Sequence, residues 1–252
     1  MSLSVCHSQL DWESRNRQSE VSHSWTVWQY RYADLPCDLL LTSCYYGNAL
    51  YEYLFLDGFD ETSYPHNVAY QFRVDLAETD PPIWRRFVVP SGITLHRLHL
   101  ILQEVMGWTN SHLYSFRIGV EEYGEPDPDN EVYFKNSKRT QLERLHITKG
   151  SAFLYEYDFG DTWIHRLVVE DILEPNSSHR HPVCLAGERA CPPEDCGGPF
   201  GYARLLGIIS NPGHEEYQDM VAWLGGQFFP ATFSLEKVNR HLKTMRLANS
   251  HR

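Results

Sequence analysis

The sequence of 252 residues lacks a hydrophobic run long enough to span a membrane. Its longest stretches without Asp, Glu, Lys or Arg are residues 220–235 and 39–51, both shorter than the roughly 20 apolar residues of a transmembrane helix. Charged residues also interrupt the first 30 positions, where a secretory signal would place its apolar core. We therefore expect a cytoplasmic protein that does not associate with membranes.

Several motifs that identify common enzymes are also missing. The sequence has no G-x-x-x-x-G-K-[ST] phosphate loop, G-x-G-x-x-G turn, G-x-S-x-G elbow or H-E-x-x-H helix. Nucleotide-binding, α/β-hydrolase and zincin functions therefore lose support.

Positive charge is scarce, because 22 Lys and Arg oppose 33 Asp and Glu to give a net charge of −11. That balance opposes non-specific attraction to nucleic-acid phosphates. The exception is the tail from Ser234, which predicts a helix with a basic face. The basic residues of this tail are Lys237, Arg240, Lys243, Arg246 and Arg252. The simpler interpretation is that they form a solvated helix face, and the alternative is that they bind nucleic acid.

Cysteines are few for a disulfide framework, since six occur in a long chain without a predicted signal. His181, Cys184, Cys191 and Cys196 share one Pro/Gly-rich segment and offer zinc ligands. Their spacing lacks the tight Cys-x-x-Cys pairs of zinc fingers, so a rigid loop with buried thiols is the competing interpretation.

Aromatic residues, in contrast, are plentiful, with 7 Trp, 15 Tyr and 12 Phe. Residues 1–66 are predicted to form an extension that is partly loose. Residues 67–252 are predicted to form an α+β domain. In that domain, 68–76 alternates apolar and polar residues as a half-buried strand does, 83–90 is its partner, and 95–106 has helical spacing. With three helices expected near the end, the pattern predicts an α+β fold. We expect a largely antiparallel sheet, one helix between strands and a C-terminal group of helices.

The stretch "YEYDFGDTWIH", residues 155–165, predicts a β-hairpin. A two-residue turn at Gly160 and Asp161 would pair Glu156 with His165 and Asp158 with Trp163. A carboxylate beside an imidazole raises the pKa of the histidine and orients its ring as a base or a ligand. The alternative is that these groups only shape the turn and form an ordinary cross-strand pair.

Two further places carry candidate chemistry. His112 falls on the apolar side of the predicted strand 112–120, which suggests a hydrogen-bonded core histidine unless a carboxylate or His165 meets it. Glu194 and Asp195 stand between Pro193 and a Gly-Gly pair. They could cap the helix expected near Gly201 or contribute to a metal or acid–base site.

Three blocks in series, "PPIWRRFVVPSGITLHRLHLILQEVMGWTNSHLYSFRIG", "YEYDFGDTWIHRLVVE" and "ACPPEDCGGPFGY", resemble the plasmid pRiA4b ORF-3-like family over residues 68–245. Members are described as uncharacterised proteins associated with mobile elements, some labelled resolvase-like. A serine recombinase needs a nucleophilic serine in an Arg cluster, which this acidic sequence does not suggest. The resemblance marks Trp84, Arg85, Arg86, Gly107, Trp108, His112, Tyr157, Asp158, Gly160, Asp161, Trp163, His165, Pro192, Pro193, Glu194, Asp195, Gly197, Gly198, Gly201 and Tyr202.

Three functions remain open from the sequence. The preferred one is a binding or accessory module that holds a protein partner through Arg85, Arg86, Trp108, Tyr157 and Trp163. The second is a metal-assisted hydrolase, such as a nuclease or phosphoesterase, in which a divalent ion is held by some of His112, Asp158, Asp161, His165, Glu194 and Asp195. The third is a structural zinc ion at the cysteine segment.

Overall fold

The computed structural model describes residues 68–126, 134–174 and 181–245. The predicted extension 1–66 and the basic residues Arg246 and Arg252 lie outside these ranges. No helix in the described part of the chain is both long and apolar enough to cross a membrane.

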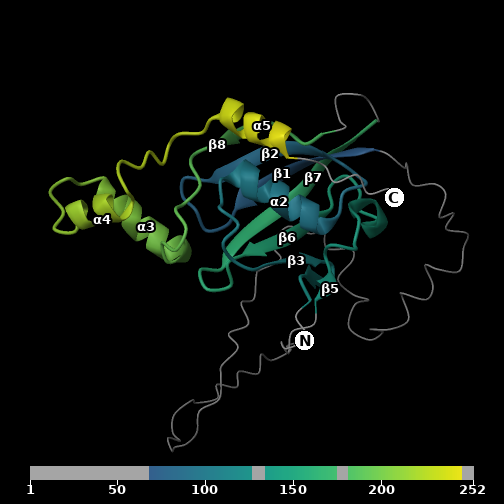
Figure 1. The fold of residues 1–252 in the computed structure, drawn as a ribbon, viewed down its shortest axis with the longest axis horizontal. Coiled ribbons are helices and arrows are strands. Elements are labelled where there is room, and N and C mark those ends of the chain that lie inside the picture. The colour runs from purple at the N-terminus through teal and green to yellow at the C-terminus, as the bar shows by residue number, and fades with distance from the viewer. Residues whose placement is uncertain (1–67, 127–133, 175–180, 246–252) are drawn as a thin grey trace, which may run out of the picture. The chain divides into compact units, whose positions relative to one another are not determined.

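The described residues form one eight-stranded sheet with the order β5-β4-β3-β6-β7-β1-β2-β8 (Figure 1). Neighbouring strands are antiparallel except for the short parallel pair β4–β5. The strands are β1 (Ala69–Leu76), β2 (Ile83–Pro90), β3 (Tyr114–Ile118), β4 (Glu121–Gly124), β5 (Lys135–Asn136), β6 (Ala152–Tyr157), β7 (Trp163–Leu173) and β8 (Val183–Glu188).

The helices complete the predicted α+β architecture. A single α-helix, α2 (Leu95–Met106), separates β2 from β3, and a 3-10 helix, η3 (Leu142–Leu145), precedes β6. The others, α3 (Gly198–Ile209), α4 (Tyr217–Trp223) and α5 (Leu235–Thr244), follow the last strand. The predicted fold class is therefore confirmed.

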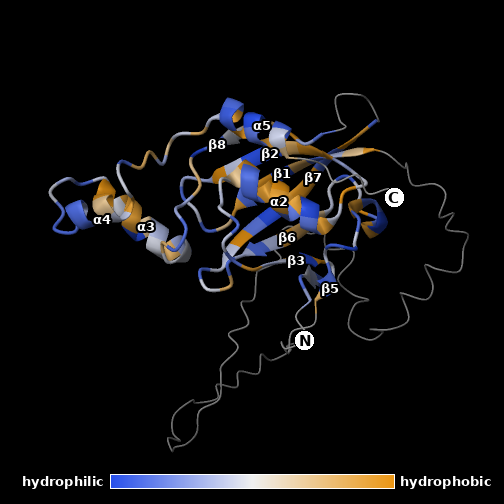
Figure 2. Ribbon diagram, in the orientation of Figure 1, coloured by the Kyte–Doolittle hydropathy of each residue, from blue (hydrophilic) through white to orange (hydrophobic). Residues whose placement is uncertain are grey.

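The core lies between α2 and one face of the sheet. Alternation along β1 buries Tyr70, Phe72, Val74 and Leu76, as the period-2 pattern predicts. Figure 2 shows apolar residues on α2 and the central strands. The Thr94 hydroxyl accepts a hydrogen bond from the Arg97 amide and so caps α2 at its start. At its end Gly107 takes the left-handed conformation (φ 112°) that stops a helix.

Three strands were not anticipated from the sequence, namely β4, β5 and β8. β4 and β5 extend the sheet beyond β3, and β8 lies in the Pro/Gly-rich segment that carries the cysteines. β8 is an edge strand, so it needs no sustained apolar pattern. Its backbone is also held by a side chain, because the Asn239 amide bonds to both the N–H and the C=O of Cys184 at 2.9 Å.

The predicted register of the β6–β7 hairpin is wrong by one residue. Tyr155 pairs with His165 and Tyr157 with Trp163, so Glu156 lies opposite Ile164 and does not meet His165. The connection comprises residues 158–162, closed by a bond from the Thr162 N–H to the Asp158 carbonyl. Because side chains alternate between faces, this shift joins the aromatic residues of β6 with Trp163 and His165 in the core.

Candidate functional site

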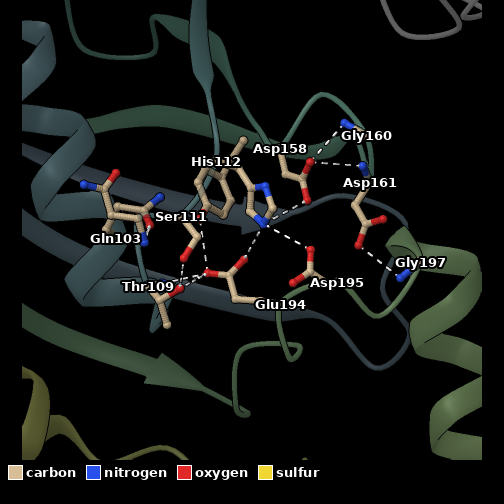
Figure 3. Close-up of polar contacts among 12 residues, drawn as sticks. Gln103, Thr109, Ser111, His112, Asp158, Gly160, Asp161, Glu194, Asp195 and Gly197 are labelled. Atoms are coloured by element: carbon tan, nitrogen blue, oxygen red, sulfur yellow. Dashed lines mark hydrogen bonds and ion pairs between the residues drawn. The ribbon is translucent and has the colours of Figure 1, made fainter.

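Three loops converge beside the hairpin and bring four predicted site residues together. His112 lies near the end of the loop between α2 and β3, Asp158 begins the hairpin loop, and Glu194 and Asp195 lie between β8 and α3. We call these four residues the His112 cluster. Figure 3 shows their side chains directed toward one another, with the His112 ring at the centre.

The Nε2 atom of His112 is the common point of the cluster. It lies 3.2 Å from Asp195 Oδ1, 3.6 Å from Asp158 Oδ2 and 3.8 Å from Glu194 Oε2 (Figure 3). Both the His112 Nε2 and the Glu194 Oε2 atoms are nonetheless buried, and neither has a hydrogen-bond partner among the residues that the structure describes. Buried polar atoms without partners are uncommon and costly, and here two of them face the same point.

Glu194 is fixed through its other carboxylate oxygen. Glu194 Oε1 accepts hydrogen bonds from the Thr109 N–H at 2.7 Å, the Thr109 hydroxyl at 2.8 Å and the Tyr157 hydroxyl at 3.1 Å. Burial raises the pKa of Tyr157 well above its usual value, so its hydroxyl stays protonated and donates. These bonds leave Oε2 free to act within the cluster.

Asp158 is held by the hairpin loop itself. Its Oδ1 atom accepts from the N–H groups of Gly160 (3.0 Å) and Asp161 (3.3 Å), which directs Oδ2 toward His112. Asp158 and Asp195 both adopt positive φ, at 59° and 56°. Aspartate tolerates this region better than most residues, but it still carries strain, and strained backbone concentrates at functional sites.

Two predicted members of the site lie elsewhere. His165 is fully buried and accepts a hydrogen bond at Nε2 from the Trp108 indole at 3.0 Å, so it belongs to the core. Burial lowers the pKa of His165 to about 4. Asp161 instead accepts from the Gly197 N–H at 3.0 Å and thereby ties the hairpin loop to the start of α3.

Of the two alternatives for Glu194 and Asp195, the capping of a helix is not observed. The residue before α3 is Gly197, and no side chain caps this helix by a hydrogen bond. The carboxylates turn to His112 instead. His112 itself precedes β3 and is 27% exposed at its side chain, so the predicted apolar orientation gives way to the alternative in which carboxylates meet it.

Most residues named for partner binding are structural. Trp108, Tyr157 and Trp163 are buried, and so is Arg85. The Arg85 guanidinium donates to five backbone carbonyls and stacks on Phe233 at 4.2 Å. Arg86 is the one with an accessible side chain, and it pairs with Glu170 at 2.5 Å. The five carbonyls that accept hydrogen bonds from Arg85 belong to Trp84, Val105, Met106, Glu188 and Arg189.

The cysteine segment does not assemble the predicted zinc site. Among the described residues, the only group of three or more potential ligands within reach of one ion is His112, Asp158 and Asp195, which contains no cysteine. Burial raises the pKa of Cys184 to about 11 and of Cys196 to about 12, so both remain thiols. The alternative of a rigid loop with buried thiols holds only in part, because Cys184 is buried but lies in strand β8, while Cys191 and Cys196 lie outside the strands and are partly buried.

Residues that sequence reasoning missed lie around the cluster. Thr109 positions Glu194, and His96 and His99 line a pocket that His112 also lines. A weak signal existed, because the spacing of His96 and His99 places both on one side of the predicted helix. Nothing in the sequence showed that this side faces the His112 cluster.

The fold and the cluster define an α+β protein with a histidine–carboxylate group where three loops meet. The model of the plasmid pRiA4b ORF-3-like protein family matches residues 68–237, and the chain belongs to this family. It is 38% identical over 156 residues to uncharacterized protein y4hQ of Sinorhizobium fredii (strain NBRC 101917 / NGR234), covering 62% of this chain and 80% of that protein.

The fold has also been observed in a solved relative. MM3350 from Methanosarcina mazei Go1, described as a protein of unknown function, is 32% identical in sequence, with a TM-score of 0.62. The match covers 71% of this chain and 99% of that one. The relatives therefore establish family and fold, while function must be argued from the site.

Proposed function

We propose that this protein binds one divalent metal ion through His112, Asp158 and Asp195 and uses it to activate water for hydrolysis. The observation that carries the proposal is the convergence of these three ligand atoms, all within 4.8 Å of one another. An ion bound at about 2.1 Å holds neighbouring ligand atoms about 3.0 to 3.4 Å apart. The distance of 3.2 Å between His112 and Asp195 fits that spacing, and 3.6 Å to Asp158 lies just beyond it.

The donor set favours particular ions. Imidazole nitrogen suits zinc, iron and related ions, whereas carboxylate oxygen suits manganese and magnesium. A set of one nitrogen and two oxygens therefore favours Zn²⁺ or Mn²⁺ over Mg²⁺. Three protein ligands also leave coordination positions for water and substrate, as catalytic sites require.

Glu194 is suited to act as the general base. Its Oε2 atom is buried, has no hydrogen-bond partner within the described part of the chain and lies 3.8 Å from His112 Nε2. It is not part of the three-ligand group. A divalent ion lowers the pKa of a bound water toward 7, and a carboxylate within hydrogen-bond reach then accepts the proton.

The competing function as a protein-binding module remains a prediction. The aromatic residues named for it are buried in the core, so their chemistry does not support a partner surface. The hydrolase hypothesis gains in comparison, because four of its six named residues converge on one point.

Calorimetric titration of the full chain with Zn²⁺ and Mn²⁺ tests the metal site. We expect one ion per chain and a higher melting temperature on binding. His112→Ala and Asp158→Asn should each weaken binding at least tenfold. His241→Ala is the matched control, since His241 also approaches a carboxylate, Glu104, at 3.3 Å but outside the cluster. Absence of binding, or equal binding by wild type and His112→Ala, would refute the proposal.

A further inference from the structure

A pocket of about 390 Å³ opens beside the His112 cluster. Its volume lies in the range of small-molecule sites. His112 belongs to the cluster and also lines the pocket. A group bound in the pocket would therefore lie next to the proposed metal ion. The other main lining residues of the pocket are His96, His99, Leu113, Phe134 and Phe159.

Two imidazoles that line the pocket, those of His96 and His99, are uncharged at neutral pH. His99 donates from Nε2 to the Asn110 side chain at 2.7 Å and accepts at Nδ1 from the Tyr155 hydroxyl at 2.8 Å. This neutral tautomer agrees with burial, which lowers the pKa of His99 to about 4. Burial also lowers the pKa of His96. Neither ring supplies a positive charge to a bound anion.

The rim of the pocket is apolar and accessible. Leu113 is 62% exposed and Phe159 is 41% exposed, although both are large hydrophobic residues. The rings of Phe134 and Phe159 lie 6.3 Å apart. Such residues around a concave surface favour contact with an apolar or aromatic group.

The charge of the site disfavours a phosphorylated substrate. None of the described residues that line the pocket is Lys or Arg, and its carboxylate, Glu125, already pairs with Lys138 at 2.9 Å. Within the described contacts, the cluster carboxylates approach the His112 ring and no Lys or Arg side chain. Three carboxylates and one divalent ion leave a net charge of −1. Phosphoryl-transfer sites instead concentrate positive charge on the transferred group.

We propose that the substrate is an uncharged acyl amide whose apolar or aromatic side chain occupies this pocket, and that the C–N bond is hydrolysed at the His112 cluster. This inference rests on the proposed metal-dependent hydrolysis. Water transfers a proton to Glu194 Oε2, and its oxygen forms a bond to the carbonyl carbon. The C–N bond then breaks and the departing nitrogen takes the proton from Glu194, giving a carboxylic acid and an amine.

The test uses metal-loaded full-length protein and four chromogenic probes. These are the 4-nitroanilides of N-acetyl-phenylalanine and N-acetyl-aspartate, 4-nitrophenyl phosphate and bis(4-nitrophenyl) phosphate. We expect cleavage of the phenylalanine anilide at least tenfold faster than of the others, and its loss in Glu194→Gln with metal binding retained. Two outcomes would overturn the inference but not the metal site. In the first, the protein binds metal and cleaves a phosphate ester. In the second, it binds metal and cleaves none of the probes.

Occupation of the pocket has its own readout. Phe159→Asp and Leu113→Asp should each raise the KM for the phenylalanine anilide at least tenfold and weaken N-acetyl-phenylalaninamide binding similarly, without changing metal affinity. Either variant suffices if the other fails to fold. The control is Val120→Ala, because Val120 is 91% exposed and does not line the pocket. Unchanged KM and amide affinity in both Asp variants would refute the pocket assignment.

Discussion

The indole Nε1 of Trp108 donates a hydrogen bond to Nε2 of His165 at 3.0 Å within the core. Because Nε2 accepts, the His165 proton resides on Nδ1, which donates to the Trp163 carbonyl at 3.0 Å. Both ring nitrogens are therefore satisfied, and the histidine is held neutral. This pair joins the loop after α2 to strand β7, and the same loop carries His112 to the cluster.

Trp108→Phe is expected to destabilise the fold. The Trp108 indole is the only donor to the buried His165 Nε2 among the described residues. Its removal costs about 1 to 3 kcal/mol in the free energy of unfolding, in addition to lost packing. Urea denaturation measures the difference. Trp84→Phe is the control, because the Trp84 indole bonds to the exposed Glu188 at 3.2 Å and water can replace that partner. Equal losses in the two variants would contradict the role of the Trp108–His165 bond.

Stability should fall as pH decreases from about 6.5 to about 4. Burial lowers the folded-state pKa of His165 to about 4, below its ordinary value of 6.5. In this window the unfolded chain binds a proton and the folded chain does not. The free energy of unfolding then drops by about 1.4 kcal/mol per pH unit for one such histidine.

His99 adds a contribution of the same sign, because burial also lowers its pKa to about 4. His165→Gln should reduce the dependence of stability on pH. This dependence is measured as the change in melting temperature between pH 8 and pH 5. A wild-type protein that is equally stable at pH 5 and pH 7 would contradict neutral burial of these rings.

Arg85→Lys should be far more harmful than Arg86→Lys. The ammonium group of lysine offers three donors and cannot serve the five carbonyls that the Arg85 guanidinium binds. We expect a loss of about 3 kcal/mol or more in the free energy of unfolding at Arg85. At the more accessible Arg86–Glu170 pair we expect less than about 1 kcal/mol. Similar losses from urea denaturation of both variants would refute this assignment.

Asn239→Asp should weaken the attachment of edge strand β8. The aspartate keeps an oxygen for the Cys184 N–H but loses the donor to the Cys184 carbonyl. The expected cost is about 1 to 3 kcal/mol in the free energy of unfolding, measured in urea. Asn211→Asp is the matched control, since Asn211 uses only its side-chain oxygen, toward the Gly213 N–H at 3.1 Å. A tolerated Asn239→Asp would show that β8 does not depend on this amide.

The elements with strong local patterns could be predicted from the sequence. The alternation of β1 and the helical spacing over residues 95–106 reflect the periods of strand and helix, and the structure confirms both elements. The hairpin was located correctly, but its register was wrong. A two-residue turn is the usual choice for this sequence, whereas burial of Trp163 and His165 beside Tyr155 and Tyr157 requires the longer loop.

The sequence by itself determined the fold class, the family and a set of polar residues with the right chemistry for a site. Tertiary structure alone decided which of them meet. His112, Asp158 and Glu194 are far apart in the chain, and the distances between their side chains depend on how three loops pack together. His165 has suitable chemistry too, but strand alternation directs it into the core, where burial keeps it neutral and away from the cluster.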